Sequence, residues 1–82
     1  MTAQAIVMIN TDVGKENEIF EQLFELPEVK EVYMVYGIHD IITIIEADSM
    51  DTLRSLITEK IRRMDGVKST LTSIVVMRKK KD

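Results

Sequence analysis

The turn Gly37–Asp40 carries the residue types in this chain that are best suited to bind a small charged molecule. Gly37 can adopt backbone angles that side chains disfavour and lets a ligand approach the main chain closely. Backbone amides in such a turn can bind a carboxylate. Asp40 could receive an α-ammonium group or could instead cap the turn, and His39, the single histidine, lies beside it.

A second group of polar side chains lies near the start of the last expected strand. Ser69, Thr70 and Thr72 provide hydroxyls that could donate to a ligand carboxylate. Because side chains alternate along a strand, Ser69 points to one face and the two threonines to the other. We therefore expect only part of this set to join the turn in one pocket.

The same residues offer little for other kinds of chemistry. His39 and Asp40 are the candidates for acid–base work, and no nucleophile–base pair accompanies them. One histidine with scattered carboxylates gives no transition-metal pattern, and the six methionines lie mostly at core spacing. We expect no cofactor and no metal site.

Composition narrows the class of protein. The 82 residues include no cysteine, which excludes disulfides and thiolate metal sites and fits a cytoplasmic protein. No apolar run is long enough to cross a membrane. The net charge is −3, with −9 in residues 1–53 and +6 in residues 54–82. The one basic run, Arg78–Lys81, is expected to be a solvated terminus, and we expect no direct nucleic-acid binding.

The elements that must position these residues follow from periodicity. Alternating strand and helix patterns predict the order βαββαβ in a single domain over residues 1–82. The expected elements are a strand over 3–10, a helix from a cap at Thr11 or Asp12 to Leu26, strands over Val29–Tyr36 and Ile41–Ala47, a helix from Ser49 to Gly66, and a strand over Val67–Met77.

Two of these strands are apolar on both faces, namely Ala5–Ile9 and Ile41–Ile45. Such strands belong in the centre of a sheet, and the more polar second and fourth strands belong at its edges. With right-handed crossovers this predicts an α+β, ferredoxin-like fold with a four-stranded antiparallel sheet in the order 4-1-3-2.

Two helices can cover only one face of that sheet. Four or five large aliphatic side chains then remain uncovered on the other face, and burying them is worth about 6–15 kcal/mol. A second copy of the chain is the simplest cover, so we expect a homodimer of the dimeric α/β-barrel type. A monomer would require the C-terminal tail to fold back over the sheet.

Three segments resemble the effector-sensing (RAM) domain of the leucine-responsive and asparagine-responsive (Lrp/AsnC) regulators. They are VYGIHDI over Val35–Ile41, LITEKI over Leu56–Ile61 and DGVKSTLT over Asp65–Thr72. The Gly-x-x-Asp turn before an aliphatic strand, followed at the right distance by Gly-Val-x-x-Ser/Thr-x-Thr, carries most of the resemblance, which extends over nearly the whole chain.

The resemblance implies a ferredoxin-like fold, dimers formed through the sheet face, and assembly into rings such as octamers or decamers. It also implies that an amino acid or related metabolite binds between subunits, with Gly37, His39, Asp40, Ser69, Thr70 and Thr72 as the effector-binding candidates. Full-length members carry an N-terminal helix-turn-helix domain, which this sequence lacks. The sequence is therefore similar to the stand-alone sensing domains.

The resemblance thus implies a non-enzymatic sensor that modulates transcription, with full-length Lrp/AsnC regulators as its expected partners. Two alternatives stay open. The first is a small dimeric ferredoxin-like enzyme of the monooxygenase or isomerase type, which would need His39 or Asp40 as its acid or base. The second is an oligomerisation module that binds no ligand.

Overall fold

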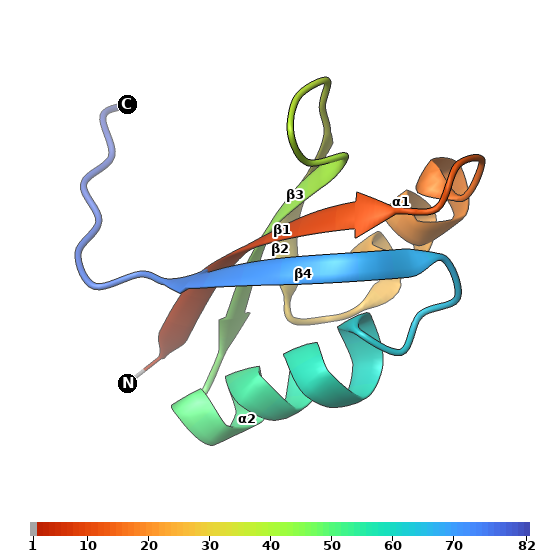
Figure 1. Ribbon diagram of the computed structural model, residues 1–82. Helices are drawn as coiled ribbons and strands as arrows, with labels where there is room; N and C mark the ends of the chain where they lie inside the picture. The colour runs from red at the N-terminus through yellow and green to blue at the C-terminus, as the bar shows by residue number, and fades with distance from the viewer. Residues whose placement is uncertain (1) are drawn as a thin grey trace.

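The computed structural model describes residues 2–82, and Figure 1 shows one antiparallel sheet with its helices packed on one side. Its elements follow the predicted order. They are β1 (Ala3–Thr11), α1 (Glu16–Glu25), β2 (Val29–Met34), β3 (Ile41–Ala47), α2 (Met50–Ser55), the π-helical segment η1 (Leu56–Ile61) that continues α2, and β4 (Val67–Ile74).

The sheet has the order β2-β3-β1-β4, which is the predicted 4-1-3-2 order written from the other edge. All three strand pairs are antiparallel. The two strands that are apolar on both faces are the central pair, joined in a register that places Ile9 opposite Ile41 and Ala5 opposite Ile45. The ferredoxin-like fold predicted from the sequence is confirmed.

One face of the sheet forms the hydrophobic core with the helices. Alternate residues of β1 and β3 are buried there, and Ile19 and Leu23 of α1 pack onto them. The fully buried members of this core are Ala5, Val7, Ile9, Ile19, Leu23, Ile41, Ile45, Leu53 and Ile61. Within residues 2–82, Thr43 is the one fully buried polar residue, and its hydroxyl donates to the carbonyl oxygen of Glu31.

The opposite face of the sheet has no helix over it. One row of side chains on this face runs across all four strands, because Met8 pairs with both Leu71 and Ile42, and Ile42 pairs with Tyr33. Ile6 and Ile44 form the next pair along. We call this surface of Ile6, Met8, Ile42, Ile44, Leu71 and Tyr33 the open face. Leu71 is 55% exposed and Tyr33 48% exposed.

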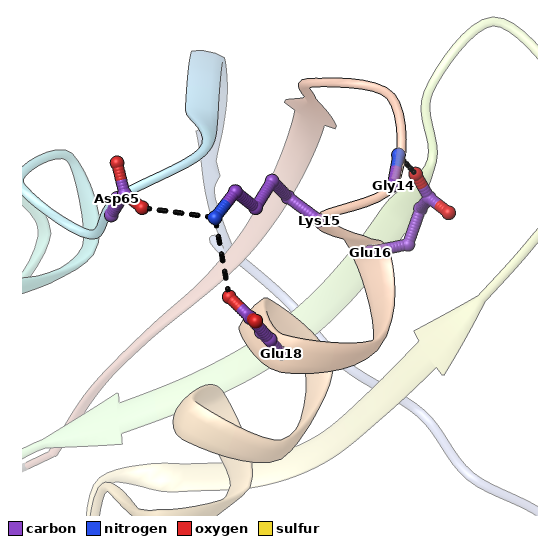
Figure 2. Close-up of polar contacts among 5 residues, drawn as sticks. All are labelled: Gly14, Lys15, Glu16, Glu18 and Asp65. Carbon is purple, nitrogen blue, oxygen red and sulfur yellow. Dashed lines mark hydrogen bonds and ion pairs between the residues drawn. The ribbon is translucent and has the colours of Figure 1, made fainter.

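The first helix begins later than the sequence predicted. Thr11 is the last residue of β1 and Asp12 lies in the loop, so neither caps α1, whose N-cap is Lys15 without a side-chain cap. Figure 2 shows the contacts that organise this loop instead. The Glu16 carboxylate accepts from the Gly14 amide at 2.8 Å, and Lys15 Nζ lies 3.2 Å from Asp65 and 3.6 Å from Glu18.

The Lys15 contacts join two loops that are distant in the sequence. Asp65 precedes β4, so its ion pair with Lys15 holds the loop before α1 against the loop before β4 (Figure 2). The hydrogen bond and charge of Asp65, followed by the charge of Glu18, raise the pKa of Lys15 above its usual value. The backbone amide of Asp12 donates to the carbonyl of Gly66 at 2.8 Å, which reinforces the same junction.

The second helix changes its winding halfway. Ser49 caps α2 as predicted, because its hydroxyl accepts from the Thr52 amide at 3.1 Å. From Leu56 the helix is a π-helix, and its residues Leu56, Ile57 and Ile61 are buried. The helix ends at Ile61, so the expectation that it runs to Gly66 is wrong; Gly66 lies in the turn before β4, with a φ of +95°.

The C-terminal residues leave the sheet earlier than predicted. β4 ends at Ile74 instead of Met77, after which the Val75 amide makes a last bond to the Gln4 carbonyl at 2.8 Å. Val76 is 94% exposed and Met77 82% exposed, and Met77, Arg78 and Lys79 line a shallow groove with Ile6 and Ile44, so the tail borders that end of the open face. Among residues 2–82, no helix combines the length and the apolar character needed to cross a membrane.

Candidate functional site

The turn that precedes β3 is fastened to the end of β1 by Asp40. The Asp40 backbone amide donates to the Ile9 carbonyl at 3.0 Å, and its own carbonyl accepts from the Val35 amide at 2.9 Å. Its side-chain Oδ2 accepts from the backbone amide of Thr11 at 2.8 Å and from the Thr11 hydroxyl at 3.3 Å. We considered two roles for Asp40, binding an α-ammonium group and capping the turn. The structure shows the second role.

The rest of the turn is open to solvent. Tyr36 and Ile38 are essentially fully exposed on either side of Gly37, and a Cβ atom at Gly37 would meet nothing within 4 Å. The φ of Gly37 does not lie in the positive region, so the expectation that this glycine is needed for an unusual backbone angle is wrong. Unhindered approach to the main chain remains its distinctive property.

Asn10 belongs to this site although the sequence did not single it out. It follows Ile9, whose partner on β3 is Ile41, so Asn10 comes next to Asp40 at the end of the two central strands. On its other side Asn10 pairs with Ser69, and Asn10 Nδ2 donates to Ser69 Oγ at 3.3 Å. Asn10, Asp40 and Ser69 therefore lie in one row at this end of the sheet, with Asp40 in the turn just before β3.

Two buried atoms at this end of the sheet have no hydrogen-bond partner within residues 2–82. They are Asn10 Oδ1, a carbonyl acceptor, and His39 Nδ1 in the adjacent turn. Buried polar atoms are nearly always hydrogen-bonded in folded proteins. An acceptor and a ring nitrogen left unused beside an acid and a hydroxyl are the features expected of a site that receives a polar ligand or a partner surface.

The two predicted threonines do not share this row. Thr70 pairs with Ile9 and Thr72 with Val7, so both lie on the helix side of the sheet, opposite to Ser69, as strand alternation predicted. Thr70 is half-buried, and Thr72 is exposed. Thr72 instead borders a separate groove of about 230 Å³ between α2, η1 and β4, lined also by Met50, Leu53, Arg54, Ile57, Thr58 and Ile74.

The structure thus divides the six predicted site residues. Gly37, His39, Asp40 and Ser69 lie at one end of the sheet, where Asn10 and Thr11 join them. A signal for Asn10 was present in the sequence, because it is the first polar residue after the aliphatic run of β1 and therefore comes where that run meets the turn before β3.

Comparison with known proteins gives a family. The model of the Lrp/AsnC ligand binding domain matches residues 4–82. An uncharacterised helix-turn-helix transcriptional regulator of Pyrococcus abyssi is 36% identical over 76 residues, which cover 93% of this chain and 48% of the regulator. The chain therefore spans about half the length of the curated relatives it matches.

Solved structures agree with this assignment. A hypothetical protein from Pyrococcus horikoshii is 42% identical and superposes with a TM-score of 0.86 over 95% of this chain and 93% of its own. A transcriptional regulator of Neisseria meningitidis, solved as a complex with L-Met, shares the fold at 18% identity, with a TM-score of 0.85 over 96% of this chain and 53% of its own. On the strength of the family match, this chain belongs to the Lrp/AsnC ligand-binding domains.

Proposed function

We propose that this chain is an effector-sensing domain that binds an amino acid or a related small metabolite and modulates transcription through regulators of its own family. The observation that carries the proposal is the pair of unused buried atoms, Asn10 Oδ1 and His39 Nδ1, beside Asp40 and Ser69 in a chain of the Lrp/AsnC ligand-binding family.

The chemistry of the site suits a zwitterion. Asn10 Oδ1 is a free acceptor, and the Asp40 carboxylate carries negative charge, so both favour an α-ammonium group. The Ser69 hydroxyl and the exposed backbone amides around Gly37 can donate to a carboxylate. An amino acid carries these two groups on one carbon atom, Cα, which is why we prefer it to a simple amine or a simple acid.

A second copy of the chain would complete the site. The row of Asn10, Asp40 and Ser69 lies at one end of the sheet and continues the surface formed by Met8, Ile42 and the rest of the open face. Packing two open faces together buries the aliphatic side chains and encloses whatever is bound at their margin. We propose a homodimer of this kind as the binding unit, with assembly into an octameric or decameric ring as its extension.

Thermal denaturation against the twenty amino acids tests binding. Saturation at about 100 times the dissociation constant adds about 2.7 kcal/mol of stability. In a domain of this size each kcal/mol raises Tm by about 4–8 °C. L-Met belongs in the panel because the Neisseria regulator binds it, although that regulator shares only the fold. No shift with any of the twenty at millimolar concentration contradicts an amino-acid effector.

A matched pair of variants locates the site. Asn10→Ala removes the free acceptor and is expected to abolish the ligand-induced rise in Tm. Asn17→Ala makes the same change on the exposed surface of α1 and is expected to preserve it. The comparison uses the ligand-induced rise in Tm of each variant, and not its Tm without ligand. Equal shifts in the two variants would place the ligand elsewhere, with the groove beside Thr72 as the next candidate.

Partnership with a regulator is a separate part of the proposal. A tagged form of this chain, co-expressed with a full-length Lrp/AsnC regulator from the same source, is expected to yield mixed assemblies whose DNA affinity changes when the effector is added. Recovery of the tagged chain only with copies of itself would contradict that part and leave effector binding intact.

A further inference from the structure

The C-terminal tail, residues 75–82, has a composition that its surroundings do not explain. Val76 and Met77 are almost fully exposed, and four consecutive bases, Arg78–Lys81, follow them. The tail leaves β4 at one edge of the sheet, and Met77, Arg78 and Lys79 line a shallow groove of about 280 Å³ with Gln4, Ile6 and Ile44, while most of the tail's surface stays exposed. A purely solubilising tail has no need of two large apolar side chains directly before its charges.

A groove with the complementary composition lies at the other edge of the sheet. It has a volume of about 510 Å³ and is formed by α1 and the edge strand β2. Its lining residues are Phe20, Glu21, Phe24, Glu31, Val32 and Tyr33. The Phe24 ring is 64% exposed and the Tyr33 ring 48% exposed, so apolar surface is available between two carboxylates.

We infer that this α1–β2 groove binds the C-terminal tail of a second copy of the chain. In an extended tail, Met77 points to the same side as Lys79 and Lys81. Met77 can then lie against the exposed aromatic rings, which thioether groups favour. The two lysines reach the acidic rim of the groove, and ammonium groups over aromatic faces add to the attraction.

The charges favour this pairing over other occupants. Helix α1 carries Glu16, Glu18, Glu21 and Glu25 and no base, so the groove lies beside a strongly acidic surface. The acidic groove repels nucleic acid, whereas the tail is the most basic segment of the chain. The tail and the groove lie at opposite edges of one sheet. The tail of one copy can therefore dock in the groove of the next copy and join the two.

A second copy is a better source of the tail than the same chain. To reach its own groove, the tail would have to cross from β4 over β1 and β3 to β2. On the uncovered side this path crosses Ile6, Met8, Ile42 and Ile44, the same apolar surface that pairing of two open faces would bury. A tail from a neighbouring copy reaches the groove without crossing Ile6, Met8, Ile42 or Ile44, and it meets the open face only at Tyr33, which belongs to both surfaces.

Cross-linking between two different single-cysteine variants tests the inference directly, because the chain has no cysteine of its own. A Met77→Cys form is mixed with a Phe24→Cys form and treated with a short bis-maleimide. Any link between positions 77 and 24 must then join two copies. A mixture of Met77→Cys with Thr58→Cys, an exposed position on η1, is the matched control.

We expect the 77–24 link to form at least about tenfold faster than the 77–58 link, because docking raises the effective concentration of the two thiols. The advantage should disappear near 1 M NaCl, where the screening length is only about 3 Å. Reversing the charge of the tail with Lys79→Glu, Lys80→Glu and Lys81→Glu should also remove the difference between the two rates. Adding Glu21→Lys and Glu31→Lys in the groove-bearing partner should restore it.

Three outcomes would overturn the inference. The first is equal rates for the two mixtures. The second is a dilute double variant, Met77→Cys with Phe24→Cys, that links within one chain faster than the mixture links between chains. The third is a tail reversal that weakens binding to duplex DNA and leaves the 77–24 rate unchanged, which would assign the tail to nucleic acid. None of these measurements depends on an amino-acid effector, so the test is independent of the proposed function.

Discussion

The Asp40 carboxylate accepts a hydrogen bond from the backbone amide of Thr11, with 2.8 Å between Thr11 N and Asp40 Oδ2. Thr11 is the last residue of β1 and Asp40 immediately precedes β3, so this contact joins the ends of the two central strands. The candidate binding turn is thereby held at a fixed position relative to Asn10 and Ser69. In the proposed function, the same acid that anchors the turn also supplies the negative charge that an ammonium ligand would meet.

The first prediction concerns this anchor. Asp40→Ala leaves the partly buried Thr11 amide without an acceptor, which is expected to cost about 1–3 kcal/mol of stability. Asp40→Asn keeps an acceptor oxygen and should cost clearly less. Urea denaturation at one fixed protein concentration measures both, because the stability of an oligomer varies with concentration. Equal losses in the two variants would show that charge, and not the hydrogen bond to Thr11, is what matters.

Much of the fold could be predicted from the sequence because burial on both faces leaves a clear pattern. The runs Ala5–Ile9 and Ile41–Ile45 had to be central, and the polar strands had to be edges. Boundaries were less predictable. Thr11 resembles a helix cap in sequence, and only the contact with Asp40 shows that it belongs to β1. Likewise, nothing in the sequence of Leu56–Ile61 distinguishes a π-helix from an α-helix.

The candidate site was only partly predictable for a different reason. Alternation along β4 fixed which side Ser69 and Thr72 face, but pairing between strands decides which residues meet, and that register is set by the whole sheet. Asn10 was missed because its importance depends on standing between Asp40 and Ser69, residues distant from it in the chain. The exposure of Phe24 likewise depends on how α1 is rotated against β2, which its own sequence does not determine.

A second prediction compares three glycines. Gly66 has a φ of +95°, and a Cβ atom there would lie 2.7 Å from Lys15 Cβ. Gly14 has a φ of +87° with open space around it, while Gly37 has neither constraint. Gly14→Ala should therefore cost about 1–2 kcal/mol from backbone strain. Gly66→Ala should cost more than Gly14→Ala, and Gly37→Ala should leave the unfolding free energy nearly unchanged.

The ranking, more than any single value, is the test of the glycine series. If Gly37→Ala proves as destabilising as Gly66→Ala, the turn before β3 has a tighter conformation than the structure gives it. Chemical denaturation of the three variants beside the parent chain provides the comparison.

A third prediction concerns the open face. Ile42→Lys places a charge in the middle of this surface, between Met8 and Tyr33. If two open faces pack together, burying that charge is expected to cost about 3 kcal/mol or more, which raises the dimer dissociation constant more than about a hundredfold. Gln22→Lys makes the same change in charge on the exposed side of α1 and should leave the dimer intact. Sedimentation equilibrium at several concentrations distinguishes the two variants, and an Ile42→Lys form that stays dimeric would rule out this interface.

The last prediction is a titration of Tyr33. The Tyr33 hydroxyl donates to Glu31, and this hydrogen bond, with the charge of Glu31, raises the pKa of Tyr33 above its usual value of 10.0. The hydrogen bond needs the protonated phenol, so its contribution to stability is complete below pH 10 and is lost as the pH rises through the folded-state pKa. In a Tyr36→Phe background, phenolate absorbance reports Tyr33 alone, and its midpoint should lie above 10.0.

Adding Glu31→Gln should move the midpoint down, because the neighbouring negative charge is gone, whereas Glu21→Gln on the same groove should leave it in place. A midpoint that does not respond to Glu31→Gln would mean that the two side chains do not interact in solution.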